Sequence, residues 1–103
     1  MERHLSQNKE LLLKNCHLVT ASDEFEADLL IRDGRIAAIG NQLTTTGTTY
    51  DVHGLFVMPG GIDTHVHLEH PIDRIGISTA DDFFTGSVAA ACGGTTTIID
   101  FAL

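Results

Sequence analysis

Val57-Met58-Pro59-Gly60-Gly61-Ile62-Asp63-Thr64-His65-Val66-His67 is the stretch that decides how the rest of this chain is interpreted. An apolar strand pattern runs directly into two histidines that stand two residues apart. Because side chains alternate between the two faces of a strand, His65 and His67 are expected on one face, as two ligands of one metal ion must be. Pro59-Gly60-Gly61 interrupts the pattern just before them and predicts a boundary between two structural units.

Length and charge limit what this chain can be. A closed (β/α)₈ barrel takes roughly 200 residues or more, so within 103 residues such a fold can be present only as its opening segment. Fourteen acidic residues against six basic ones, with no Lys/Arg cluster, argue against nucleic-acid binding. No apolar run reaches the length of a membrane span, and residues 1–4 do not lead into a signal-peptide core. We therefore expect a cytoplasmic protein without a membrane partner.

The first half of the chain predicts a small antiparallel sheet over residues 11–58, after a polar leader at 1–10. Strands are expected at the apolar or alternating segments 11–20, 27–32, 35–40 and 50–57. Asp33-Gly34 is typical of a two-residue type I′ hairpin. The threonine-rich segment 43–49 is expected to be an exposed loop.

The second half predicts one right-handed βαβ unit, the first step of a barrel or of an open α/β sheet. A strand is expected over Ile62–Leu68, ending in the histidines. Ser78–Asp82 offers an N-cap with acidic residues in the first turn of a helix over Phe83–Cys92. Gly93-Gly94 should end that helix, and the β-branched run Thr95–Phe101 is typical of a buried parallel strand.

Several other residues are candidates for supporting roles. Asp63 shares strand parity with the two histidines and is expected to orient or support them. Asp100 ends the second strand of the unit and is expected to be an interior or capping group. Glu69 either reaches the mouth of the site or is simply solvated. Cys16 and Cys92 lie far apart and form no metal-binding motif, so we expect two buried free thiols.

Residues 59–71, Pro-Gly-Gly-Ile-Asp-Thr-His-Val-His-Leu-Glu-His-Pro, resemble the first-strand signature of the amidohydrolase superfamily. The later blocks 80–86 and 89–101 are similar to the dihydropyrimidinase and D-hydantoinase branch in particular. The resemblance covers about residues 11–103. It implies that 11–58 are the N-terminal part of a small β-sandwich domain, and that 59–103 begin a TIM-like (β/α)₈ barrel.

The resemblance also implies an enzyme with two zinc ions, which hydrolyses the ring amide bond of hydantoins or dihydropyrimidines with a zinc-activated hydroxide. His65 and His67 would bind the more buried ion, a carboxylated lysine would bridge both ions, and an aspartate from a later strand would move the proton. The complete enzyme would be a homotetramer. The lysines of this chain, Lys9 and Lys14, precede the histidines and do not match the bridging position, so the chain alone is predicted to be inactive.

Three alternatives remain open at the level of sequence. Allantoinase and dihydroorotase share the same first-strand signature and differ mostly further along the chain. A second hypothesis is that the protein is a non-catalytic scaffold of the same fold, although the two intact histidines count against it. A truncated gene product is the third, because an unpaired edge at residues 95–101 would favour aggregation. The loop 71–79 is expected either at the substrate mouth or as plain surface.

Overall fold

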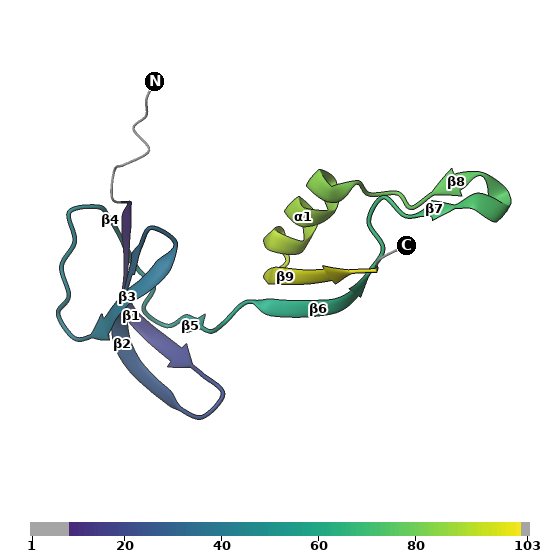
Figure 1. The fold of residues 1–103 in the computed structure, drawn as a ribbon. Helices are drawn as coiled ribbons and strands as arrows, with labels where there is room; N and C mark the ends of the chain where they lie inside the picture. The colour runs from purple at the N-terminus through teal and green to yellow at the C-terminus, as the bar shows by residue number, and fades with distance from the viewer. Residues whose placement is uncertain (1–8, 102–103) are drawn as a thin grey trace, which may run out of the picture. The chain divides into compact units, whose positions relative to one another are not determined.

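The computed structural model describes residues 9–101, and the chain divides between Pro59 and Gly60 into two compact units (Figure 1). The first unit is a β-sheet. The second unit is a βαβ arrangement that carries a short hairpin. None of the helices among residues 9–101 has the length and hydrophobicity needed to cross a membrane.

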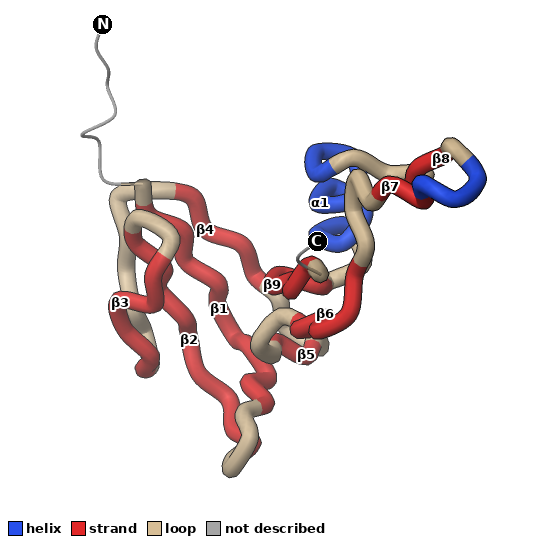
Figure 2. Tube along the Cα trace, turned by 45° about the vertical axis from the view of Figure 1, so that its right-hand side comes forward, coloured by secondary structure: helices blue, strands red, loops and turns tan. Residues whose placement is uncertain are grey.

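The first unit is a five-stranded sheet with β1 at its centre (Figure 2). Its strands are β1 (Glu10–Val19), β2 (Glu24–Arg32), β3 (Arg35–Gly40), β4 (Thr48–Asp51) and β5 (Phe56–Val57). β2 pairs with β1 in antiparallel fashion, but β4 and β5 both run parallel to β1. The prediction of an antiparallel sheet is therefore wrong for the last two strands. The reason is that a long loop, rather than a tight hairpin, carries the chain from β3 to the far side of β1, which gives a mixed sheet.

The hairpin between β2 and β3 has the predicted turn. Asp33 and Gly34 have φ angles of 52° and 78°, as both central residues of a type I′ turn require. The predicted leader is wrong at its last residue, because Glu10 begins β1, and Lys9 just before it is hydrogen-bonded to the hairpin turn. The Asp33 backbone N–H donates to Lys9 O at 2.9 Å, and Arg32 Nε donates to Glu10 Oε2 at 2.8 Å. The first eight residues of that leader lie outside the described residues.

Every buried side chain among the described residues belongs to the first unit: Leu12, Cys16, Leu18, Ala27, Asp28, Leu29 and Leu30. Residues from neighbouring strands β1 and β2 thus form the core on one small sheet. The prediction of a buried thiol is confirmed for Cys16 and wrong for Cys92, which is exposed. Cys92 ends a helix that buries none of its residues within the described chain.

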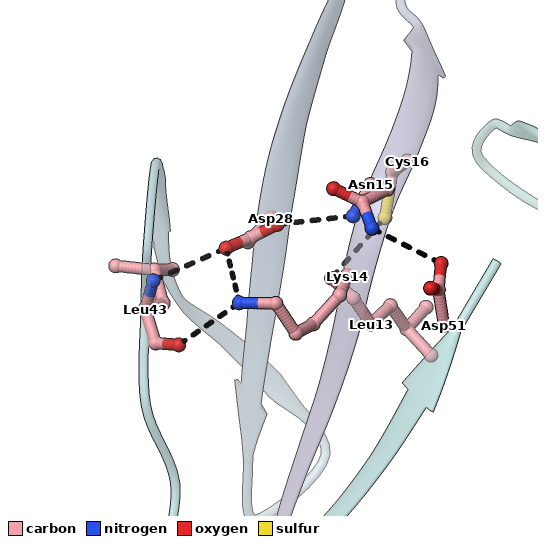
Figure 3. A network of polar contacts seen from close by, with 7 residues as sticks. All are labelled: Leu13, Lys14, Asn15, Cys16, Asp28, Leu43 and Asp51. Atoms are coloured by element: carbon pink, nitrogen blue, oxygen red, sulfur yellow. Dashed lines mark hydrogen bonds and ion pairs between the residues drawn. The ribbon is translucent and has the colours of Figure 1, made fainter. Parts of the chain in front are cut away.

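A buried carboxylate ties together four segments of the first unit (Figure 3). Asp28 Oδ1 accepts from the Asn15 backbone N–H at 3.0 Å, where β1 is bulged and Asn15 has a φ of 61°. Asp28 Oδ2 accepts from Lys14 Nζ and from the Leu43 backbone N–H, each at 3.1 Å. Asn15 Nδ2 donates to Asp51 Oδ1 at 3.1 Å. The Asn15 hydrogen bond above all, with those from Lys14 and Leu43, holds the pKa of Asp28 below its usual range.

The second unit confirms the predicted strand, helix and strand. β6 (Gly61–Val66) and β9 (Thr95–Asp100) pair in parallel, and α1 (Phe83–Cys92) lies between them in the chain (Figure 1). The segment expected to be a loop forms a small hairpin instead. It consists of β7 (Pro71–Ile72), the 3₁₀ turn η1 (Asp73–Ile75) and β8 (Ile77–Ser78), with β7 and β8 antiparallel.

The helix α1 begins and ends where its sequence predicts. Asp82 is the N-cap and accepts from the Thr85 backbone N–H at 2.7 Å, while the Thr85 hydroxyl accepts from the Asp82 backbone N–H. This capping box lowers the pKa of Asp82, chiefly through the Thr85 backbone N–H. The expectation of acids within the first turn is wrong, since the helix starts at Phe83. β9 is partly exposed rather than buried, because only β6 pairs with it in the described chain.

Candidate metal site

The two histidines lie together at the end of β6. His65 is in the strand, and His67 follows its last residue, Val66. Their Nε2 atoms are 3.0 Å apart, so both imidazoles lie on the same side, as strand alternation predicts. The C-terminal end of a parallel strand is where α/β folds place their ligand-binding residues.

The separation of the two Nε2 atoms suits a shared metal ion. Two nitrogen ligands at zinc bond lengths in tetrahedral geometry lie about 3.3 Å apart, close to the observed distance. Neutral imidazole is also a ligand that zinc and related transition metals favour. Among residues 9–101, no three His, Cys, Asp or Glu side chains come together in a way that could hold an ion. The pair could therefore supply only two of the ligands that a metal site needs.

The second ring nitrogen of His67 is consistent with a partial site. His67 Nδ1 is buried and has no hydrogen-bond partner among the described residues. A metal-bound histidine usually donates its other N–H to a carboxylate, a carbonyl or water. If Nε2 of His67 binds an ion, its Nδ1–H therefore needs an acceptor that this part of the chain does not supply.

Aromatic rings pack around the histidine pair. The Phe101 ring lies against both imidazoles, with centroid distances of 4.3 Å to His65 and 4.6 Å to His67. The His70 ring stands edge-on to His67 at 4.8 Å. The sequence offered no signal for Phe101, since it lies 34 positions after His67 and the pairing of β6 with β9 brings the two together.

The Asp63 side chain contacts the main chain of the strand that carries His65. Asp63 Oδ1 accepts from the His65 backbone N–H at 3.1 Å, and no hydrogen bond joins this carboxylate to either imidazole in the described chain. Asp100 Oδ1 accepts from the backbone N–H groups of Leu68, at 3.2 Å, and of Phe101, at 2.9 Å. Asp100 thus joins the ends of β6 and β9 as a capping group, which is one of the roles its position predicts.

Glu69 is exposed, as expected of a solvated residue, and its carboxylate also caps a helix. Its Oε2 accepts from the Phe83 backbone N–H at 2.9 Å, which satisfies a free donor in the first turn of α1. The Glu69 backbone N–H also donates to Asp81 O at 3.0 Å. These bonds attach the segment after the histidines to the start of α1. A carboxylate 14 residues before the helix gives no local sequence signal for such a cap.

Two hydrogen bonds between His70 and Thr79 close the base of the β7–β8 hairpin. The His70 backbone N–H donates to Thr79 Oγ1 at 3.0 Å, and the Thr79 backbone N–H donates to His70 O at 3.0 Å. A polar hollow of about 460 Å³ adjoins this base, lined by Glu69, Ser78, Thr79, Ala80, Asp81, Asp82 and Thr85. The segment 71–79 is therefore an anchored hairpin that follows the histidine strand directly.

Comparison with known proteins adds an independent line of evidence. Residues 56–103 match the model of the amidohydrolase family. The D-hydantoinase of Geobacillus stearothermophilus is 56% identical over 93 residues, which are 89% of this chain. A crystal structure of a D-hydantoinase superposes with a TM-score of 0.82 at 53% identity, covering 89% of this chain. The dihydropyrimidinase from Brevibacillus agri NCHU1002 gives a TM-score of 0.81 at 46% identity, also over 89% of this chain.

The chain is therefore similar to D-hydantoinases over most of its length, and its second half matches the amidohydrolase family model. It spans 19% of the length of the Geobacillus relative and 20% of each of the two structures. His65 and His67 lie inside the part that matches the family model. Lys14 is engaged within the first unit. Its Nζ donates to Asp28 Oδ2 at 3.1 Å and to Leu43 O at 3.4 Å.

Proposed function

We propose that this chain supplies the first metal-binding strand of a cyclic amidohydrolase that acts on hydantoins or dihydropyrimidines. The observation that carries the proposal is the convergence of the His65 and His67 Nε2 atoms, 3.0 Å apart, at the end of a parallel strand. High identity to D-hydantoinases over most of the chain supports the choice of substrate class. The chain spans about a fifth of the length of these relatives, so the activity proposed here is that of an enzyme that contains this segment.

Each residue of the site has a defined task in this proposal. His65 and His67 would hold a zinc ion, and Asp63 holds the main chain at His65. Asp100 keeps the ends of β6 and β9 together, which fixes the strand that presents the ligands. A bound zinc ion would lower the pKa of a water molecule enough to give a nucleophile near neutral pH. The remaining ligands, including a carboxylated lysine between two ions, would come from the rest of the enzyme.

The fold supports a wider architectural proposal. A parallel βαβ unit with ligands at the carboxyl end of its first strand is the repeating element of (β/α)₈ barrels. We infer that β6, α1 and β9 open such a TIM-like barrel, and that the sheet of the first unit belongs to a β-sandwich domain beside it in sequence. A cytoplasmic homotetramer is the assembly that the family resemblance favours.

The test is a completed enzyme. Residues 1–103 would replace the matched segment of the Geobacillus stearothermophilus D-hydantoinase, which supplies the remainder of the chain. We expect the joined protein to bind zinc and to hydrolyse a 5-substituted hydantoin. His65→Ala and His67→Ala should each remove activity and lower the zinc content. His53→Ala, which changes an exposed histidine of the first unit, should do neither.

Two outcomes would contradict the proposal. Full zinc content and activity in both the His65 and His67 variants would show that neither histidine is a ligand. A joined protein that has a native circular dichroism spectrum but neither binds zinc nor hydrolyses hydantoins would favour the non-catalytic scaffold instead.

A further inference from the structure

We propose that Phe101 is a positioning residue, whose ring fixes the planes of both imidazoles so that their Nε2 atoms converge. The proposal rests on the proposed function of His65 and His67 as metal ligands. Phe101 is not itself a ligand, since it carries no donor atom. Its role would be to hold the ligand pair ready before an ion arrives.

The His67 ring is held by packing and by one hydrogen bond, which joins its Nε2 to His65 Nε2 at 3.0 Å. Its Nδ1 has no partner among the described residues, so no bond at that atom fixes the rotation of the ring. The Phe101 ring instead lies tilted over both imidazoles, by 33° relative to His65 and by 42° relative to His67. One aromatic face therefore restrains the two ligands together. Paired aromatic rings at these centroid distances attract each other beyond simple burial.

Phe101 is itself held in place from both strands. Its backbone N–H donates to Val66 O at 3.2 Å, between the two histidines in sequence, and to Asp100 Oδ1 at 2.9 Å. Asp100 Oδ1 also accepts from Leu68 N, directly after His67. The main chain of Phe101 is thus tied to the residues on either side of His67. A side chain from the end of β9 is thereby fixed over ligands from the end of β6.

The structure allows a sharp expectation for the loss of this ring. Without it, both imidazoles regain rotational freedom, and binding an ion must then order them. Losses of supporting contacts around metal ligands typically weaken affinity by about 10- to 100-fold. Since this contact is packing without a hydrogen bond, we expect the lower end, about a tenfold increase in the metal dissociation constant.

The test uses the completed enzyme described above, stripped of metal and titrated with Co²⁺ against a competing chelator. Phe101→Ala should weaken Co²⁺ binding about tenfold and broaden the ligand-field absorption bands, because the ligand geometry becomes heterogeneous. Phe101→Tyr keeps the ring and should restore both readouts to the starting values. Phe84→Ala removes the same ring from α1, where it is 76% exposed, and should change neither.

The outcomes separate this proposal from the function on which it rests. If the starting enzyme does not bind Co²⁺ through His65 and His67, as judged by the two alanine variants, the proposed function fails. If it binds Co²⁺ and Phe101→Ala binds equally well with an unchanged spectrum, only the role of Phe101 is overturned. A native circular dichroism spectrum of Phe101→Ala excludes unfolding as the cause of weaker Co²⁺ binding. Phe101→Leu keeps the bulk of the side chain without the aromatic face, and it should bind Co²⁺ as weakly as Phe101→Ala.

Discussion

Replacing Gly47 with alanine should destabilise the first unit, because there is no space for a side chain at this position. A Cβ atom there would lie 2.1 Å from the Glu10 carbonyl oxygen and 2.8 Å from the Glu10 carbonyl carbon. Favourable contacts between carbon atoms begin at about 3.5 Å. Both clashing atoms are backbone of β1, the central strand, so they cannot rotate away as a side chain would.

The size of the destabilisation follows from the loop that must move when Gly47 becomes alanine. Gly47 N donates to Thr45 Oγ1 at 2.9 Å, and Thr45 Oγ1 donates to Glu10 Oε1 at 2.7 Å. Relieving the clash pushes the loop away from β1 and breaks this chain of bonds just before β4. Overpacking of this kind costs about 1–3 kcal/mol in the free energy of unfolding. The Thr45 hydrogen bond is also the main reason that the pKa of Glu10 is lowered, so the variant should raise that pKa.

The assay is urea unfolding followed by far-UV circular dichroism and by the fluorescence of Tyr50, the single tyrosine of the chain, in β4. Gly40→Ala is the matched control at the other end of the same loop. Its Cβ would meet only the flexible end of Leu43, at 3.6 Å, so it should be neutral or stabilise by up to about 1 kcal/mol. Equal stability of the Gly47 and Gly40 variants would refute the packing argument.

Three further predictions concern the core, pH and local stability. Leu29→Ala removes a side chain that is 6% exposed and should lower the free energy of unfolding by about 2–5 kcal/mol in urea titrations, whereas the exposed Leu55→Ala should cost far less. Because the pKa of Asp28 is lowered in the folded state, the stabilisation that its carboxylate gives the fold is complete above about pH 4 and is lost as the pH falls through the folded pKa. Asp28→Asn should therefore flatten the dependence of the urea midpoint on pH. An unchanged dependence on pH in this variant would contradict the prediction. Hydrogen exchange of the isolated chain should protect amides of β1 and β2 more than those of β6 and β9, because every buried described side chain lies in the first unit; equal protection would be evidence against this division.

Local chemistry made much of the fold predictable. The Asp33-Gly34 turn, the ends of α1 and the parity of the two histidines each depend on a few adjacent residues, and the structure confirms them. Pairing direction was not predictable in the same way. β4 and β5 have ordinary strand sequences, and nothing in them indicates that they run parallel to β1. That choice depends on where the long loop after β3 returns the chain.

In the candidate site too, features set by adjacent residues were predictable and contacts between distant residues were not. His65 and His67 stand out because they lie two residues apart at the end of one strand. Phe101 and the capping role of Glu69 escaped sequence reasoning, because each acts across a long stretch of chain. The contact of Phe101 with the histidines depends on the pairing of β6 with β9, and the bond of Glu69 depends on the position of α1. Spacing along a strand indicates candidate ligands, whereas contacts between distant residues emerge only in three dimensions.

The most direct test of the central claim is anomalous diffraction from crystals of the completed enzyme, with data collected on either side of the zinc absorption edge. We expect an anomalous peak at about 2.0–2.1 Å from the Nε2 atoms of both His65 and His67. Zinc bound elsewhere in the enzyme, with neither imidazole in contact with an ion, would contradict it.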